Sequence, residues 1–184
     1  MASYDGMLAE TIRIQGHGGD EIPAYLARPL GAGPFPGVVV IHHMPGWDDA
    51  TREIARRFAV SGYNTICPHL HHREAPDAGP EDAAAAARAA GGVPDERMVG
   101  DIAASVRHLR WQPNANGKVG VIGYCSGGRQ SYLVAASLDV DAAVVCYGGR
   151  IVAGPDEVDE RRPVAPIDMT DRISCPVLGL FGDE

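Results

Sequence analysis

A cysteine flanked by glycines at fixed spacing is the residue in this sequence best placed for chemistry. The apolar residues 119–123 predict a buried strand, residues 126–138 predict a helix, and Gly-Tyr-Cys-Ser-Gly (123–127) joins them. A sharp strand-to-helix turn needs glycine two residues before and two residues after its centre, because a side chain at either place would clash. Such a turn would present Cys125 as a nucleophile, and the positive end of the helix dipole favours its thiolate. The alternative is a buried structural thiol in a glycine-rich turn.

A second polar segment, His-His-Met-Pro-Gly (42–46), follows the β-branched run 37–41. It resembles the loop that donates one backbone N–H to the oxyanion hole in α/β-hydrolase folds. We expect the Met44 N–H to pair with the Ser126 N–H in binding the oxyanion of a tetrahedral intermediate. His42 and His43 have a second interpretation, as a strand end packed under the next loop.

Other polar residues near predicted strand ends are candidates for substrate contact. Arg73, Arg129 and Arg150 could bind an anionic group of the substrate, because guanidinium forks suit carboxylates, or could form structural ion pairs. Tyr147 either lines the pocket or packs in the core. The histidines at 69, 71 and 72 resemble a metal cluster, but they lack the i, i+4 spacing of helical zinc ligands. We therefore predict no metal, and a loop that lines the substrate.

The elements that must position these residues alternate between strand and helix. The predicted strands are 11–14, 24–28, 37–41, 63–67, 119–123, 142–147 and 177–181. Helices are predicted over 50–60, on both sides of Gly91-Gly92, and over 126–138. Asp48 or Asp49 caps the first of them. Residues 154–171 are predicted to form a charged, proline-rich loop. This order predicts one α/β domain over 1–184, with a doubly wound, mainly parallel sheet and an antiparallel N-terminal edge. Reactive groups should then lie at the carboxyl ends of the strands.

Composition limits the kinds of partner. The chain has 184 residues with 16 basic and 24 acidic side chains, so its net charge is −8, and 45% of it is hydrophobic. This excludes a disordered chain, and the lack of Lys/Arg runs argues against nucleic acid. Its apolar runs are far below the ~20 residues of a membrane helix, so we predict no membrane partner and a cytoplasmic location. The four cysteines lack metal-finger spacing, and Cys67, Cys146 and Cys175 are predicted to be buried, reduced thiols.

Together these motifs resemble the dienelactone hydrolases, the cysteine-dependent branch of the α/β-hydrolase fold. The resemblance rests on residues 38–46, 62–68, 100–113, 117–128 and 146–149, of which Gly-Tyr-Cys-x-Gly-Gly is the most specific. It implies that Cys125 attacks the carbonyl of a small ester or lactone and forms an acyl-thioenzyme, while a histidine acts as base and acid and an aspartate orients it. It implies no cofactor and a small-molecule substrate as partner. We expect a monomer or a homodimer.

One departure from the family lies at His43. The dienelactone-specific enzymes have a glutamate just after the first parallel strand, which holds the proton of the resting cysteine, and His43 takes that position here. An imidazole there could stabilise a thiolate, bind a substrate carboxylate or serve as a neutral pocket wall.

The second departure concerns the order of the catalytic residues. In the family, the acid and then the histidine follow the nucleophile, whereas the histidines here precede Cys125, at 17, 42, 43, 69, 71, 72 and 108. Asp183, in the turn after the last strand, is the fallback acid. We therefore expect a fragment that lacks the last strand and helices, exposes the faces they cover, folds weakly and hydrolyses little. The competing interpretation is a non-catalytic α/β ligand-binding domain or an inactive truncated homologue.

Overall fold

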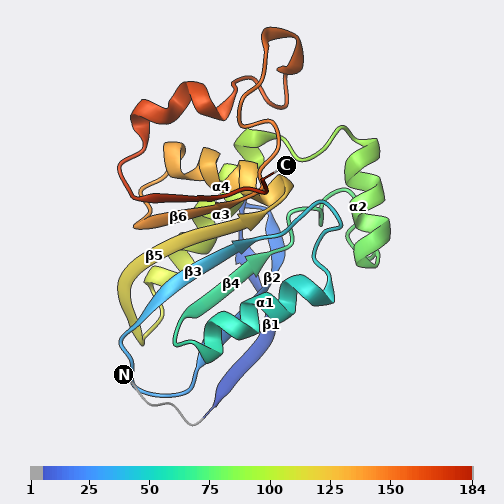
Figure 1. The fold of residues 1–184 in the computed structure, drawn as a ribbon. Helices are drawn as coiled ribbons and strands as arrows, with labels where there is room; N and C mark the ends of the chain where they lie inside the picture. The colour runs from blue at the N-terminus through green and yellow to red at the C-terminus, as the bar shows by residue number, and fades with distance from the viewer. Residues whose placement is uncertain (1–5, 184) are drawn as a thin grey trace.

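Seven strands form one sheet in the computed structural model, which describes residues 6–183 (Figure 1). In spatial order the strands are β1 (Met7–Gln15), β2 (Glu21–Pro29), β4 (Asn64–Pro68), β3 (Phe35–Ile41), β5 (Ala115–Tyr124), β6 (Ala142–Cys146) and β7 (Val177–Leu180). β1 and β2 form an antiparallel hairpin, and β2 is antiparallel to β4, whereas β4, β3, β5, β6 and β7 are parallel. The predicted α/β class, with a mainly parallel sheet and an antiparallel N-terminal edge, is confirmed.

The helices cover both faces of this sheet. α1 (Asp49–Val60) packs over β2, β4 and β3 on one face, and α3 (Asp95–Arg110) and α4 (Ser126–Ser137) pack on the other (Figure 1). α2 (Pro80–Ala89) lies to the side, before the Gly91-Gly92 break that separates it from α3. Asp48 is the residue that caps α1, since its carboxylate accepts the Thr51 N–H.

The central strands are buried on both faces, which explains their unbroken apolar sequences. On the α3 and α4 face, Val39, Ile41 and Ile66 of the sheet pack with Met98 and Leu133 of these helices. Val38, Val40 and Ile122 point to the α1 face. Residues on alternate sides of a strand can all be apolar only where both sides are covered, as in a parallel sheet between helix layers.

The register brings the carboxyl ends of four strands to one edge. Ile41 of β3 pairs with Gly123 of β5, Tyr124 of β5 pairs with Cys146 of β6, and Cys146 pairs with Leu180 of β7. The segments that follow these strands, which begin at residues 42, 125, 147 and 181, therefore start side by side. This is the edge where an α/β sheet binds its ligands.

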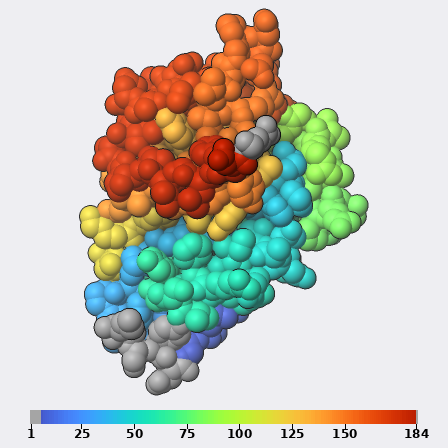
Figure 2. Space-filling model, in the orientation of Figure 1, coloured from blue at the N-terminus to red at the C-terminus, as the bar shows by residue number. Residues whose placement is uncertain are grey.

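The C-terminal part of the chain differs in two ways from the rest. β7 is an edge strand exposed along its whole length, including the apolar side chains of Leu178 and Leu180, and Figure 2 shows it in red at the molecular surface. The segment predicted as a loop over 154–171 is not wholly irregular, because Pro166–Arg172 forms a 3-10 helix that packs on α4. The sequence did not predict this 3-10 helix, because a proline at its start is equally typical of a loop.

Candidate active site

Cys125 occupies the strained turn between β5 and α4. Its backbone has φ 54° and ψ −116°, a conformation that non-glycine residues rarely adopt, and the residue is exposed. A Cβ atom on Gly123 would lie 2.7 Å from the Ser131 hydroxyl and closer still to the Gly127 carbonyl. The glycine spacing in the sequence is therefore a steric requirement of this turn, and the turn directs residue 125 outward.

Backbone hydrogen bonds hold the turn from two sides. The Cys125 N–H donates to the Cys146 carbonyl at 3.1 Å, and the Cys125 carbonyl accepts the Gly128 N–H at 2.9 Å. Gly128 itself has no room for a side chain, because a Cβ atom would lie 2.5 Å from the Cys146 carbonyl oxygen. The main chain of Cys125 is thus fixed to both β6 and α4 while its thiol stays at the surface.

The two backbone amides expected to bind an oxyanion lie on adjoining segments. Ser126 is the first residue of α4, so its N–H has no acceptor within the helix. Gly127 packs directly on the Ile41 and His42 carbonyls at the end of β3, which places the start of α4 beside the loop that contains Met44. That loop contains a turn in which the Gly46 N–H donates to the His43 carbonyl at 2.9 Å.

The remaining thiols lie in surroundings that suppress reactivity. Cys67 and Cys146 are buried and Cys175 is partly buried. In all three, burial raises the thiol pKa above its ordinary value, so they stay protonated near neutral pH. Cys125 is the one cysteine in the described part of the chain whose residue is exposed. The structure thereby separates one accessible thiol from three thiols that belong to the packing.

His43 forms a hydrogen bond with a carboxylate. Its Nε2 lies 2.8 Å from Asp48 Oδ2, and both side chains are about 30% exposed, at 31% and 28%. Burial alone would raise the Asp48 pKa, but the hydrogen bonds from the Thr51 N–H and from His43 outweigh it and lower that pKa. Asp48 therefore caps α1 and orients the imidazole at the same time.

The other histidines near this edge are buried and neutral. His42 is bonded at both nitrogens, since its Nδ1 lies 2.9 Å from the His43 carbonyl and its Nε2 accepts the Leu70 N–H at 3.2 Å. Burial lowers the pKa of His42 and of His69 to about 4 and that of His71 to about 3. His69 stacks on Trp47, with ring centroids 5.0 Å apart. These rings form packing beneath the loop at 43–48, and in residues 6–183 no three His, Cys, Asp or Glu side chains are grouped to hold a metal ion.

Arg129 is paired with a carboxylate instead of facing the sheet edge. Its two terminal nitrogens lie 2.6 and 2.9 Å from the two carboxylate oxygens of Asp95, and both side chains are about nine-tenths buried. A guanidinium engaged in a bidentate pair has lost the fork that would recognise a substrate carboxylate. Of the two interpretations of Arg129, the geometry favours the structural ion pair.

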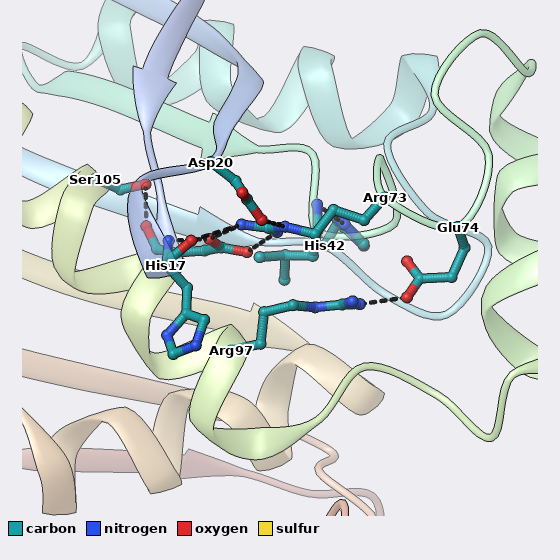
Figure 3. A network of polar contacts seen from close by, with 9 residues as sticks. His17, Asp20, His42, Arg73, Glu74, Arg97 and Ser105 are labelled. Atoms are coloured by element: carbon teal, nitrogen blue, oxygen red, sulfur yellow. Dashed lines mark hydrogen bonds and ion pairs between the residues drawn. The ribbon is translucent and has the colours of Figure 1, made fainter.

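Arg73 is likewise committed to a buried network (Figure 3). Its guanidinium binds both oxygens of Asp101, at 2.8 and 3.0 Å, and the exposed carboxylate of Asp20 at 2.7 Å. The His17 N–H donates to the same Asp101 carboxylate at 2.8 Å, so the β1–β2 turn is joined to α3. Arg150 donates instead to the Glu157 carbonyl. The structure thus gives each of the three arginines an internal partner.

Tyr147 and Asp183 follow neighbouring strands, β6 and β7, at the carboxyl edge of the sheet. Tyr147 has φ 40°, is 56% exposed, and donates its N–H to the Leu180 carbonyl at 2.7 Å. Its ring centroid lies 6.4 Å from that of Tyr124. The packed-core interpretation of Tyr147 does not match this exposure. Asp183 lies beyond β7 and is exposed, with no hydrogen bond to another described residue.

Two polar pairings could not be read from the sequence. Asp48 was identified only as a helix cap, and Asp95 was not singled out at all, although it accepts both bonds from Arg129. A signal existed for the first, because a His and an Asp five residues apart flank a short turn. None existed for the second, whose residues are 34 positions apart.

Known proteins resemble this chain in both sequence and structure. The model of the dienelactone hydrolase family matches residues 22–184. Carboxymethylenebutenolidases of Pseudomonas putida and Pseudomonas knackmussii are each 38% identical over 147 residues, which cover 77% of this chain. The crystal structure of a Klebsiella pneumoniae protein assigned to the dienelactone hydrolases superposes with a TM-score of 0.82 at 29% identity, over 95% of this chain and 72% of that one.

The matches cover most of this chain but a smaller share of its relatives. The chain spans 62% of the length of the two Pseudomonas relatives. None of the helices within residues 6–183 has the length and apolarity needed to cross a membrane. The family match covers the turn at Cys125, the loop at 42–46 and every parallel strand. The chain therefore belongs to the dienelactone hydrolase family, whose fold is that of the α/β-hydrolases.

Proposed function

We propose that this chain carries the nucleophile and the oxyanion-binding amides of a cysteine hydrolase that acts on small esters or lactones. The observation that carries the proposal is Cys125, which is exposed at a strained turn while the other three thiols are protonated and packed. A protein that needed only a structural thiol would gain nothing from holding residue 125 at φ 54°.

The proposed reaction proceeds in two displacements at the carbonyl carbon. The Cys125 thiolate attacks that carbon, and the negative charge that develops on oxygen is stabilised by the Met44 and Ser126 N–H groups. Collapse of the tetrahedral intermediate breaks the carbon–oxygen bond of the ester, releases the alcohol and leaves an acyl-thioester on Cys125. Water then attacks the thioester carbonyl, which yields the carboxylic acid and regenerates the thiol. No step requires a metal or an organic cofactor.

The relatives suggest the class of substrate. Those of Pseudomonas are named carboxymethylenebutenolidases, so a carboxymethylene-substituted butenolide, which is a lactone, is the first substrate to test. The acidic charge balance supports a small-molecule partner over nucleic acid. The cytoplasmic location and the monomeric or homodimeric state remain predictions.

Site-directed variants test the proposal. The intact mass of the natural protein is measured and compared with the 19.4 kDa of this chain. The same protein is assayed with p-nitrophenyl acetate and with a dienelactone. We expect Cys125→Ala to reduce turnover by at least about 10³-fold and to abolish the acetylated species in intact-mass spectra. Cys175→Ala, which removes a partly buried thiol, is the matched control and should stay within about twofold of wild type. Undiminished turnover by Cys125→Ala would overturn the proposal, and a wild type with neither turnover nor a reactive Cys125 would favour a ligand-binding domain.

A further inference from the structure

Three buried histidines lie beneath the loop at 43–48, which contains Met44. His42 follows β3, and His69 and His71 follow the neighbouring parallel strand β4. The three residues, which together form the histidine cluster, are only 2%, 6% and 4% exposed. The loop that holds a proposed oxyanion amide therefore lies on imidazole rings.

The His42 ring joins this loop to the segment after β4. Its Nδ1 lies 2.9 Å from the His43 carbonyl oxygen, which can only accept, so Nδ1 carries the hydrogen of the neutral ring. Its Nε2 uses the remaining lone pair to accept the Leu70 N–H at 3.2 Å. A proton added to Nε2 would remove that acceptor and turn one N–H group towards another. The link between the two segments therefore requires the neutral ring.

His69 and His71 contact the loop by packing. His69 stacks on Trp47, with ring centroids 5.0 Å apart. A Cβ atom on Gly46 would lie 3.2 Å from His71 Nδ1, so this ring packs against the backbone of the loop. The Nδ1 atoms of both histidines are buried and have no hydrogen-bond partner within residues 6–183. A charged ring at either place would be desolvated without an acceptor at this nitrogen.

The helices around the cluster bring mostly positive charge to it. Arg52 of α1 faces His69. Arg88 of α2 and Arg97 of α3 face His71. Burial, reinforced by the positive charge of neighbouring side chains, lowers the pKa of His69 to about 4 and that of His71 to about 3. Both rings are therefore neutral at ordinary pH.

Few other titratable groups lie close to the cluster. They are His43 and Asp48 beside His42, His72 beside His69, Glu74, which is ion-paired with Arg97, and Cys67 of β4, whose carbonyl accepts the Trp47 side-chain N–H. α4 meets His42 through Gly127, which does not titrate. The Asp48 carboxylate is thus the main negative charge that faces His42.

We propose that the histidine cluster is an acid-released latch that holds the loop at 43–48 on the end of the sheet. At neutral pH, His42 accepts the Leu70 N–H and the loop is closed. In acid, a proton on Nε2 breaks that bond, the segment after β4 separates from the end of β3, and the loop loses its support while the central strands stay folded. One consequence rests on the proposed function: an open loop no longer presents the Met44 N–H, so hydrolysis stops until the pH is raised.

The difference between the closed and open forms sets how steeply the latch responds. In the closed form, burial lowers the pKa of His42 to about 4, whereas in the open form the pKa returns to its ordinary value of 6.5. The closed form therefore has its full stability above about pH 6.5 and loses it as the pH falls towards 4. For His42 alone, this linkage raises the opening equilibrium constant about 50-fold between about pH 7 and about pH 4.5.

Amide hydrogen exchange, followed by NMR, tests the latch without requiring turnover. Rates at about pH 7 and about pH 4.5 are each compared with the rate of the unfolded chain at the same pH, which gives a protection factor. We expect the protection factor of Leu70 to fall by at least about 50-fold and to lie well below that of Val121 in the central sheet. His42→Gln, whose side-chain oxygen can still accept the Leu70 N–H but does not titrate, should show a fall about 50-fold smaller.

Controls separate the possible outcomes. His108→Gln removes a histidine that bonds to Gln112 near the other end of α3 from Arg97, and its Leu70 protection should fall as in wild type. Equal protection of Leu70 and Val121 at about pH 4.5 would mean that the segment opens only by global unfolding, which overturns the latch. An equal fall in His42→Gln and in wild type also overturns it.

Two further measurements cover the remaining cases. Should His42→Gln fail to fold by circular dichroism, nitrogen NMR of the His42 ring in wild type decides, and a loss of Leu70 protection that does not follow protonation of this ring overturns the proposal. Turnover of p-nitrophenyl acetate at the same two pH values distinguishes the two proposals. Release of Leu70 in acid without turnover at either pH would contradict the proposed function and support the latch.

Discussion

The Cα atom of Gly127 faces the carbonyl oxygen of Ile41 so closely that a side chain cannot be added. A Cβ atom at residue 127 would lie 2.8 Å from the His42 carbonyl oxygen and nearer still to that of Ile41. This contact joins the first turn of α4 to the end of β3. It is the physical link between the turn at Cys125 and the loop that contains His43 and Met44.

Gly127→Ala should therefore separate these two segments. We expect a loss of at least about 2 kcal/mol in the free energy of unfolding, because the atoms that would have to yield are backbone carbonyls. Slower alkylation of Cys125 should accompany the loss. Urea denaturation measures the first effect. Gly149→Ala is the control, since a Cβ atom there meets nothing within 4 Å, and equal stability of the two variants would contradict the steric argument.

The carboxylate of Asp101 should contribute far more to stability than that of Asp20, although both bind Arg73. Asp101 is fully buried and also accepts the His17 N–H. Its replacement by alanine leaves a largely buried guanidinium without its bidentate partner, which costs about 3–5 kcal/mol. Asp20→Ala removes an exposed partner that water replaces, and it should change the unfolding midpoint much less. Comparable midpoints for the two variants would show that the buried pair is not the stabilising one.

Arg129→Lys should weaken folding and leave substrate affinity unchanged. Lysine keeps the charge but cannot form the two parallel hydrogen bonds that Arg129 donates to Asp95. We expect a loss of about 1–3 kcal/mol in stability, measured by thermal unfolding. KM for the lactone should stay within about twofold. A large rise in KM at unchanged stability would restore the interpretation of Arg129 as a substrate contact.

The buried histidines should make the protein sensitive to mild acid. His42 and His69 have folded-state pKa values lowered to about 4, and His71 to about 3, from the ordinary 6.5. Below about pH 6.5 these histidines bind protons in the unfolded chain but stay neutral in the folded chain. The free energy of unfolding that is present above pH 6.5 is therefore lost as the pH falls towards 4. Each histidine contributes roughly 1.4 kcal/mol per pH unit in this window.

Urea unfolding at a series of pH values measures this loss. Between about pH 6.5 and pH 5.5 the carboxylates, whose ordinary pKa values are about 4, stay almost wholly ionised, so the histidines dominate the slope there. His71→Gln should remove the share of one histidine and make the slope shallower. A free energy of unfolding that stays constant from pH 7 to pH 5 would contradict the prediction.

Much of the fold could be predicted from local sequence patterns. The unbroken apolar run that became β3 and the strand-to-helix turn at Cys125 were recognisable because burial on both faces and the steric limits of a tight turn act on neighbouring residues. The 3-10 helix at Pro166–Arg172 was missed because its first proline suits a loop equally well.

The polar pairings could not be predicted in the same way. Arg129 of α4 meets Asp95 of α3, and Arg73 of the segment after β4 meets Asp101 of α3, only after these segments have packed together. Such partners are 34 and 28 positions apart, and no spacing rule connects them. The sequence thus indicated which side chains carry charge, whereas the packing of helices decided which of them form buried ion pairs.

Local patterns were enough to predict the parallel sheet and the place of Cys125 at its edge, because strand burial and the glycine-bounded turn depend on neighbouring residues. Three properties depend on the folded chain: the shielding of Cys67, Cys146 and Cys175, the pairing of Arg129 with Asp95, and the orientation of His43 by Asp48. The reason is physical: exposure and hydrogen-bond partners depend on which surfaces the folded chain brings together, and those surfaces come from distant parts of the sequence.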